Sequence, residues 1–293
     1  VASGRQGPDA MLDYLQGLAR DTDVLAFRGR PGMDGRFFYN EDMSGFNFDR
    51  LTLPLDSLLG ELRASEESHL YLGSTSVEEC FPGFRSSNDL DLGDALPLVS
   101  VWMGGRSRIS AHFDAPENIA CVVAGKRRFT MFPPEQLPNL YVGPLDLTPA
   151  GQAISLVDFA APDYQRFPRF QQAMEAAVVA VLEPGDGLYL QRMWWHHVEG
   201  LESLNVLINY GWTPGVQGRG NPLHALVHAL MTIRDLPQSQ REAWRGLFEH
   251  YVFADDADYS HIPESRRGVL GDIDAGTARQ LRAMLRSRLG GSG

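Results

Sequence analysis

The chain has 293 residues, of which 43% are apolar and 22% charged, a composition that excludes a mini-protein, a collagen-like chain and a disordered one. Its 26 basic and 37 acidic residues give a formal net charge of −11, which disfavours nucleic acid as a general partner because an acidic surface repels phosphates. Two cysteines cannot form a disulfide framework, and neither a membrane-spanning apolar run nor a secretion signal is visible, so we expect a cytoplasmic location.

Apolar residues at helical spacing predict a helix over residues 10–20 and a second, shorter one over 51–62. Further along, the pattern changes to short runs rich in β-branched and aromatic residues, separated by Gly and Pro. We predict strands at residues 68–73, 96–103, 118–123, 128–132, 178–182, 187–190 and 204–210. Many short strands without intervening helices favour a sandwich or barrel over a parallel sheet.

Helical periodicity returns after Trp212. Three amphipathic helices are predicted, from Asn221 to near Pro237, over 239–252 and over 275–289. Their apolar faces must either cover the sheet or pair with another copy of the chain. The sequence thus divides into an N-terminal helical and loop segment at 1–66, a β core at 67–217 and a C-terminal helical segment at 218–293.

A candidate metal site begins with His112 and Asp114, which flank Phe113 in a strand-like run. Because alternate residues of a strand share a face, the imidazole and the carboxylate project to the same side. A third ligand must come from elsewhere, and the chain offers two adjacent histidines, His196 and His197. Two histidines and one carboxylate on one face of a metal leave positions open for a chelating co-substrate and dioxygen, as in non-haem Fe(II) oxygenases. The His-x-Asp pattern alone is short enough to occur by chance.

Five motifs occur in a fixed order between Leu70 and Trp212, about half of the chain. They are His112-Phe-Asp114 with Asn118 four positions on, Gly125-Lys-Arg-Arg-Phe-Thr-Met-Phe-Pro-Pro134, Asp163-Tyr-Gln-Arg-Phe-Pro168, Pro184-Gly-Asp186 and Trp194-Trp-His-His-Val-Glu199. In this order they closely resemble the cupin-like JmjC hydroxylases, including the asparaginyl hydroxylases that act on hypoxia-inducible factor. The resemblance implies an all-β core with added helices: a double-stranded β-helix, or jelly roll, flanked by N-terminal helices and a C-terminal helical segment.

The resemblance also implies Fe(II) as the metal, 2-oxoglutarate as the co-substrate and O2 as the oxidant. Carried over by position, the catalytic metal ligands are His112, Asp114 and His196, the first histidine of the adjacent pair. His197 then faces the opposite side of its strand. The simpler interpretations are a surface turn for His112 and Asp114, and a buried core imidazole for either of the two adjacent histidines.

Arg127 stands where the family has a lysine that anchors the distal carboxylate of 2-oxoglutarate. Arginine can hold a carboxylate bidentately but is longer and planar, so a shifted register could bring Lys126 there instead. Tyr71 matches a family tyrosine that reaches the same carboxylate, and Asn118 and Asn209 match asparagines near the metal and co-substrate. Arg127 in a solvated basic turn and Tyr71 in the core remain the simpler alternatives.

Two family side chains are missing. Gly73 stands where the asparaginyl hydroxylases have a glutamine that touches substrate, so that substrate preference is not inherited. Ile109 stands in the place of a family threonine and removes a hydrogen-bonding group.

The residues and the resemblance together predict a 2-oxoglutarate-dependent dioxygenase that hydroxylates a C–H bond. An acidic body suits basic peptides or small molecules better than nucleic acid and favours a protein or peptide side chain as substrate. A small molecule or a modified tRNA base stays open. Two alternatives stand beside this: a metal-binding scaffold without turnover that acts as a dimeric interaction module, and a cupin isomerase or lyase that uses Zn or Mn. By resemblance, and because of their apolar faces, we expect the C-terminal helices to form a homodimer.

Overall fold

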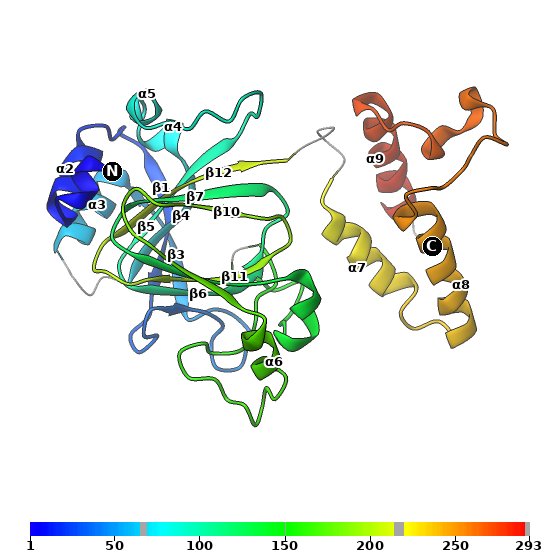
Figure 1. The fold of residues 1–293 in the computed structure, drawn as a ribbon, viewed down its shortest axis with the longest axis horizontal. Helices are drawn as coiled ribbons and strands as arrows, with labels where there is room; N and C mark the ends of the chain where they lie inside the picture. The colour runs from blue at the N-terminus through cyan, green and yellow to red at the C-terminus, as the bar shows by residue number, and fades with distance from the viewer. Residues whose placement is uncertain (65–68, 150, 214–219, 291–293) are drawn as a thin grey trace. The chain divides into compact units, whose positions relative to one another are not determined.

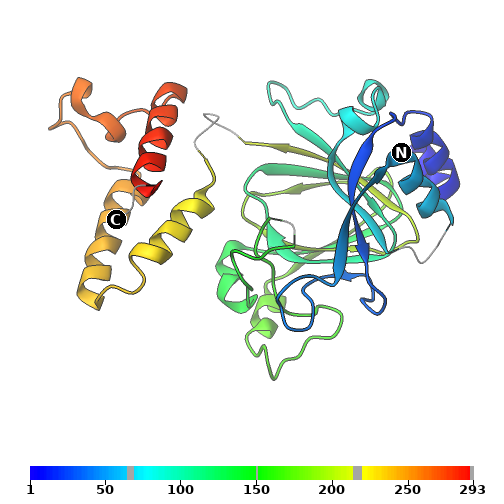
Figure 2. The ribbon, with the colours of Figure 1, turned by 180° about the vertical axis from the view of Figure 1, so that it is seen from behind.

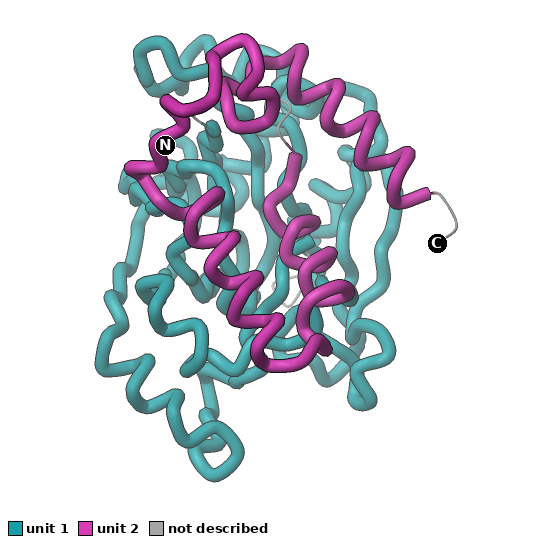
Figure 3. Tube along the Cα trace, turned by 90° about the vertical axis from the view of Figure 1, so that its right-hand side faces the viewer, with its two compact units in different colours: residues 1–214 teal, residues 215–293 magenta. Residues whose placement is uncertain are grey.

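The computed structural model describes residues 1–64, 69–149, 151–213 and 220–290. The chain divides into two compact units, Val1–Pro214 and Gly215–Gly293, which we call unit 1 and unit 2 (Figure 3). Unit 1 is built on two β-sheets, and the described part of unit 2 contains helices only. No helix among the described residues is long and apolar enough to cross a membrane.

Two sheets pack face to face in unit 1 (Figure 1). The first has the order β10 (Gly187–Leu190), β7 (Glu117–Ala124), β12 (Asn205–Trp212), β5 (Leu98–Gly104), β4 (Leu70–Ser76), β1 (Asp23–Gly29) and β3 (Phe48–Pro54). The second has the order β2 (Arg36–Phe37), β6 (Ser107–Phe113), β11 (Trp195–Gly200), β8 (Arg127–Phe132) and β9 (Val178–Leu182). All neighbours are antiparallel except β2 and β6. The predicted fold class, a double-stranded β-helix with added helices, is confirmed.

The seven predicted strands are present as β4, β5, β7, β8, β9, β10 and β12, with ends within three residues of those predicted. Residue 68, where the first of them was predicted to begin, lies outside the described residues. The structure adds β1, β2 and β3 within residues 1–66, which the sequence assigned to helices and loops. Strands β1 and β3 belong to the seven-stranded sheet and β2 to the five-stranded sheet, and all three form part of the cavity wall described below.

Helices α2 (Pro8–Gln16) and α3 (Leu55–Ala64) cover the outer face of the seven-stranded sheet (Figures 1 and 2). Their buried residues recur every three or four positions: Met11, Leu12, Leu15, Leu55, Leu58, Leu59 and Leu62. Such spacing puts one apolar stripe on each helix, and burial of that stripe against the sheet stabilises both elements. Short helices α1 (Ala2–Arg5), α4 (Val77–Cys80) and α5 (Phe84–Ser87) complete this side of the unit.

The predicted helix over residues 51–62 is wrong at its start. Residues 51–54 belong to β3, which pairs with β1 along its whole length and places Thr52 opposite Leu25. The helix begins only at Leu55, whose N–H donates to the carbonyl of Thr22 at 2.9 Å. Pairing with a distant strand therefore outweighed the local helical spacing of the leucines.

A long insertion between β8 and β9 covers the outer face of the five-stranded sheet. It contains a 3₁₀ helix (Pro134–Asn139) and α6 (Phe170–Glu175). Its apolar residues form a separate cluster with Phe132 and Trp195 of the sheet. The five-stranded sheet thus has an outer face packed in aromatic side chains and an inner face turned toward the seven-stranded sheet.

Unit 2 buries almost nothing within the chain. Its helices are α7 (Pro222–Thr232), α8 (Gln238–Phe248) with a π-helical turn (Glu249–Phe253), two 3₁₀ turns (Glu264–Arg266 and Gly268–Leu270) and α9 (Ala275–Gly290). The three predicted helices are confirmed. Ala278 is the one buried apolar residue among the described residues of this unit, while Met231 and Phe253 are 71% and 65% exposed.

Candidate active site

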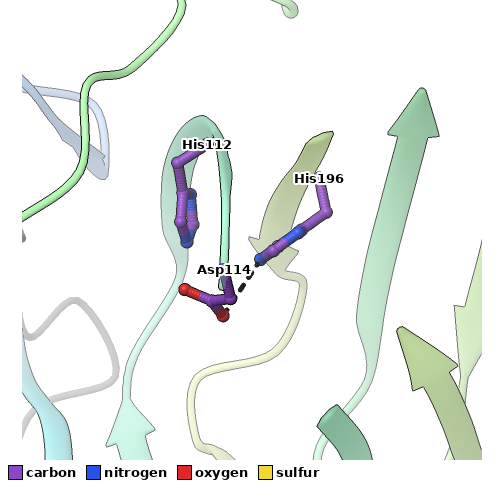
Figure 4. Close-up of side chains that lie close together, drawn as sticks. All are labelled: His112, Asp114 and His196. Atoms are coloured by element: carbon purple, nitrogen blue, oxygen red, sulfur yellow. Dashed lines mark ion pairs between the residues drawn. The ribbon is translucent and has the colours of Figure 1, made fainter. Parts of the chain in front are cut away.

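Two neighbouring strands bring three potential metal ligands together (Figure 4). His112 lies in β6 directly opposite His196 in β11, and Asp114 follows the end of β6. The ring centroids of the two histidines are 4.4 Å apart, and Nε2 of His196 lies 3.7 Å from Oδ2 of Asp114. All three ligand atoms lie within 4.8 Å of one another. Small side-chain movements would place them on a single ion with metal–ligand bonds of about 2.1 Å.

Backbone carbonyls orient both imidazoles of this cluster. Nδ1 of His112 lies 2.9 Å from the carbonyl of Ser110, and Nδ1 of His196 lies 3.0 Å from that of Trp194. An Nδ1–H that donates to a carbonyl leaves Nε2 with its lone pair free toward the cluster, the tautomer that a metal requires. Burial, and next the neighbouring His112, lower the pKa of His196 to about 4, so its imidazole is neutral at physiological pH.

A directed chain of hydrogen bonds holds the carboxylate of Asp114. The indole N–H of Trp102 donates to Oδ1 of Asn209 at 2.7 Å, Nδ2 of Asn209 donates to Oδ1 of Asn118 at 3.3 Å, and Nδ2 of Asn118 donates to Oδ2 of Asp114 at 3.5 Å. An indole can only donate and a carboxylate can only accept, so the two ends fix the orientation of both amides between them. Trp102 lies two strands from Asn118 in the seven-stranded sheet, and the hydrogen-bond chain from it thereby positions a potential metal ligand.

A β-bulge in β6 shapes the same wall. The register with β11 pairs His196 with His112 but Val198 with Ile109, so Ser110 and Ala111 together lie opposite His197. Without the bulge, residues three positions apart on a strand would face opposite sides. The bulge turns both Ile109 and His112 toward the inner face, so an apolar side chain lines the cavity near the cluster.

One cavity of about 330 Å³ lies between the sheets and next to the cluster. The site residues predicted from the sequence all line it: Tyr71, His112, Asp114, Asn118, Arg127, His196 and Asn209. Their strands come from both sheets, so the cavity depends on the packing of one sheet against the other. The structure thus brings together side chains that are up to 138 positions apart in the sequence, Tyr71 and Asn209 being the extremes.

Arg127 is a buried cation without an anion. It is the first residue of β8, just after the turn at Gly125, whose φ of +73° and close approach to the Leu204 carbonyl both require glycine. Its side chain is 2% exposed and donates through a terminal nitrogen to the carbonyl of Trp102 at 3.1 Å, while its Nε has no partner. Among the described residues no carboxylate pairs with it. A buried, uncompensated guanidinium is costly, and a ligand carboxylate in the cavity would relieve that cost.

Lys126 does not reach this cavity. Its Nζ lies 2.7 Å from Oε1 of Glu183 in an exposed ion pair. Tyr71 does reach it, and its ring lies 5.3 Å from that of Phe37 and 6.4 Å from that of Trp102. Of the two cations considered for co-substrate binding, the structure places Arg127 at the cavity and Lys126 outside it.

His197 lies on the opposite face of β11. Its ring stacks on Phe159 at a centroid distance of 4.3 Å, inside the aromatic cluster of the outer face, and neither ring nitrogen has a hydrogen-bond partner. Burial, and next the charges of Arg36 and Arg108, lower its pKa to about 3. It is a neutral core residue and takes no part in the metal cluster.

Several residues of the site were not found from the sequence. Trp102, Ser110 and the residues of β1 and β3 carry no motif, and only strand pairing brings them to the cavity. Strand pairing also determines the position of Gly73, which lies with Ser74 in a bulge of β4 opposite Trp102. A Cβ at Gly73 would approach the Trp102 ring to 3.2 Å, so the indole fills the space beside this glycine.

Comparisons with known proteins agree with this geometry. The model of a family described as cupin-like domain matches residues 1–217. Lysine-specific demethylase JMJ31 of Arabidopsis thaliana is 28% identical over 119 residues, which are 40% of this chain and 21% of that protein. HSPB1-associated protein 1 of Homo sapiens is 34% identical over 112 residues, 38% of this chain and 22% of that protein. tRNA wybutosine-synthesizing protein 5 of Gallus gallus is 27% identical over 146 residues, 45% of this chain and 43% of that protein.

The matched segments thus span less than half of the length of these curated relatives. Among solved structures, the X-ray structure of E. coli ycfD matches 97% of this chain and 60% of that chain, with a TM-score of 0.40 and 14% identity. The specific likeness to the asparaginyl hydroxylases of hypoxia-inducible factor stays a prediction. The residues that the family model matches include every residue that lines the cavity. The chain belongs to the cupin-like, JmjC-type domain family.

Proposed function

We propose that this protein is an Fe(II)- and 2-oxoglutarate-dependent oxygenase that hydroxylates a C–H bond. The observation that supports this most is that a His-Asp-His cluster and the unpaired guanidinium of Arg127 line one cavity. When bound, iron and co-substrate supply the oxidation: O2 and 2-oxoglutarate are consumed, succinate and carbon dioxide are released, and the substrate C–H becomes C–OH. Every other requirement falls on residues of the chain.

The first requirement is a metal site with free positions. His112, Asp114 and His196 supply two imidazole nitrogens and one carboxylate, a set suited to Fe(II) with room for other ligands. The carbonyls behind the two imidazoles and the amide chain behind Asp114 hold these side chains in place before any ligand arrives. Such support reduces the cost of ordering the ligands upon binding.

The second requirement is an anchor for the dicarboxylate co-substrate. Arg127 can donate to its far carboxylate through its guanidinium, whose Nε has no partner in the protein, and Tyr71 lines the same cavity. Arg127 also donates to the carbonyl of Trp102, which begins the amide chain to Asp114. The anchor and the metal ligand are therefore held by one tryptophan.

The third requirement is exclusion of bulk water from the reacting groups. Phe37, Phe129 and Leu207 line the cavity around the polar groups. An apolar wall strengthens the electrostatic contacts inside it and limits side reactions.

The test is turnover of 2-oxoglutarate by the purified chain with Fe(II) and ascorbate. We expect succinate formation and O2 consumption in equal amounts, with both lost in the Asp114→Ala variant. Binding of 2-oxoglutarate without turnover, or no binding at all by calorimetry, would favour the non-catalytic scaffold. Zn or Mn in anaerobically purified protein, together with no succinate, would favour an isomerase or lyase.

As substrate we propose a protein or peptide side chain. The relatives are named for a lysine demethylase, for association with HSPB1 and for tRNA modification, so their names alone leave the class open. The net charge of −11 opposes a phosphate backbone near unit 1. A tRNA substrate would overturn this choice and would show as succinate formation that depends on added tRNA.

We also propose that unit 2 pairs with a second copy of this chain. Four apolar side chains of unit 2 are more than two-fifths exposed: Leu226, Val227 and Met231 of α7, and Leu247 of α8. Exposed apolar side chains that gather on helix faces mark interaction surfaces. Light scattering after gel filtration should give twice the chain mass. The Val227→Glu and Met231→Glu double variant should give a monomer, whereas Gln240→Glu should not. A monomeric parent chain would contradict the proposal.

A further inference from the structure

We infer that the substrate presents a carboxylate next to an apolar group, and that Arg50 recognises this carboxylate at the cavity. This inference rests on the proposed function and specifies its substrate class. It starts from the charges of the residues that line the cavity, because those charges select what can enter.

The cavity is cationic although the protein is acidic. Apart from the histidines, its charged lining residues in the described part of the chain are Arg50, Arg127 and Asp114, which sum to +1. A divalent metal adds +2 and 2-oxoglutarate adds −2, so the loaded site keeps a charge of +1. Arg127 is taken by the co-substrate and Asp114 by the metal, and the remaining charge is therefore that of Arg50.

Arg50 lies on the cavity wall that the sequence did not predict. It is in β3, directly opposite Phe27 of β1. Its guanidinium carbon is 6.0 Å from the centre of the Phe27 ring and 5.9 Å from that of Phe46, and its closest polar contact is the Pro149 carbonyl at 3.5 Å. These contacts hold the side chain at the cavity without neutralising it.

Neighbouring arginines of the same two-stranded segment behave differently. Arg28 donates to both carboxylate oxygens of Glu61, at 2.8 and 2.6 Å, and Arg30 pairs with Asp49 at 2.6 Å. Arg50 has no acidic partner among the described residues. The arginines of β1 and its end are thus paired with acidic side chains, while Arg50, which is exposed, keeps its remaining donors for a ligand.

The wall beside Arg50 selects the rest of the ligand. Phe27, Phe37 and Phe48 pack against one another at centroid distances of 5.5 and 5.6 Å and line the cavity. The cavity volume of about 330 Å³ is shared with the co-substrate and leaves room for a small acid or a side chain. A cationic group such as an alkylammonium is disfavoured there by Arg50, so the preference for basic peptides expected from the net charge is reversed inside the cavity.

The test compares three probes of one shape: 3-phenylpropanoate, 3-phenylpropanamide and 3-phenylpropylamine. The chain is loaded with Mn(II) and saturated with N-oxalylglycine, a non-reacting analogue of 2-oxoglutarate that occupies Arg127. Binding is measured by calorimetry and by quenching of tryptophan fluorescence, since Trp102 lines the cavity. We expect the acid to bind at least about tenfold more tightly than the amide, the size of a charge-assisted hydrogen bond, and the amine to bind most weakly.

Arg50→Gln should abolish the preference for the acid over the amide. The matched control is Arg30→Gln, which removes an arginine whose charge the protein already neutralises and should leave the preference intact. Equal binding of acid and amide to the parent chain, or a preference that survives in Arg50→Gln, overturns the inference. If N-oxalylglycine does not bind, that result contradicts the proposed function. The same comparison of acid and amide in Arg127→Gln without the analogue then still tests the inference about Arg50.

A second pair of probes identifies the source of the carboxylate. Acetyl-Phe-Asp-amide and acetyl-Phe-Asn-amide differ only in the charge of one side chain. If the acidic peptide binds as tightly as the free acid, with the same dependence on Arg50, the carboxylate is that of a peptide side chain. If only 3-phenylpropanoate shows the preference, the substrate is a free acid and the protein or peptide assignment is wrong.

Discussion

The two faces of strand β11 carry adjacent histidines in opposite environments. On the inner face, His196 has a carbonyl behind it, His112 across from it and Asp114 beside it. On the outer face, the ring of His197 stacks on Phe159, and neither of its nitrogens has a hydrogen-bond partner. Both pKa values are lowered by burial, to about 4 and about 3. A depressed histidine pKa therefore does not by itself identify a ligand, whereas an oriented ring nitrogen beside a second ligand does.

The arginines on the outer face have an acidic partner. Asp158 accepts a hydrogen bond from Arg108 at 2.8 Å and lies 3.5 Å from Arg36, so both arginines near His197 have an acidic partner. Arg127 on the inner face has no such partner among the described residues. Unpaired polar atoms that line a cavity indicate a ligand, while the same atoms in a closed core only cost stability.

The largest expected effect separates the two histidines. His196→Ala should weaken Mn(II) binding by at least about a hundredfold, because loss of even a supporting residue costs ten- to a hundredfold and this change removes a ligand. His197→Phe keeps the stacked ring on Phe159 and should bind Mn(II) as the parent chain does. Calorimetry on both variants checks the prediction, and equal loss in the two would break the distinction between the faces.

The next effect concerns the two neighbouring cations. Arg127→Gln should lower the affinity for 2-oxoglutarate between about tenfold and a hundredfold, since hydrogen bonds between charged groups contribute about 1.5–3 kcal/mol. Lys126→Gln removes a cation outside the cavity and should leave that affinity unchanged. Titration of 2-oxoglutarate into the Mn(II)-loaded variants measures both. An effect confined to Lys126 would reverse the assignment of the anchor.

A smaller effect tests the hydrogen-bond chain behind Asp114. Trp102→Phe keeps an aromatic ring but removes the indole N–H that fixes both amides, and metal affinity should fall about tenfold. Trp244→Phe, in unit 2, is the control for loss of an indole and should change nothing. Mn(II) titration followed by electron paramagnetic resonance gives both affinities. Unchanged binding in Trp102→Phe would show that Asp114 needs no support from Trp102.

The smallest effect is one of stability and pH. The pKa of His197 is about 3 in the folded chain against about 6.5 in the unfolded one, so between these values only the unfolded state binds the proton. Stability is therefore lost as pH falls below about 6.5, by up to about 1.4 kcal/mol per pH unit from this residue. His197→Phe lacks this loss. Urea unfolding of both chains at pH 7.5 and 5.5 should show a smaller decrease for the variant, and parallel decreases would contradict the prediction.

Much of the fold and the candidate site follows from local patterns in the sequence. Period-two runs predict seven strands, and spaced leucines predict α2 and the three helices of unit 2. The His-x-Asp pair and the distant histidine indicate the metal cluster because residue type and strand alternation are local properties. Arg127 is likewise indicated by a local motif, because it follows a turn at Gly125 that requires glycine.

Strand pairing over long distances determines the rest. Residues 51–54 have helical spacing but pair with β1. The pairing of β3 with β1 brings Arg50 to the cavity, and the pairing of β1 with β4 brings Phe27 there. The bulge that turns Ile109 inward exists only relative to β11, and the role of Trp102 exists only relative to Asn209. By itself the sequence determined which residues are candidates for the metal site; the tertiary structure decided which charges and rings surround them. The physical reason is that register and packing depend on contacts between residues that are far apart in the chain.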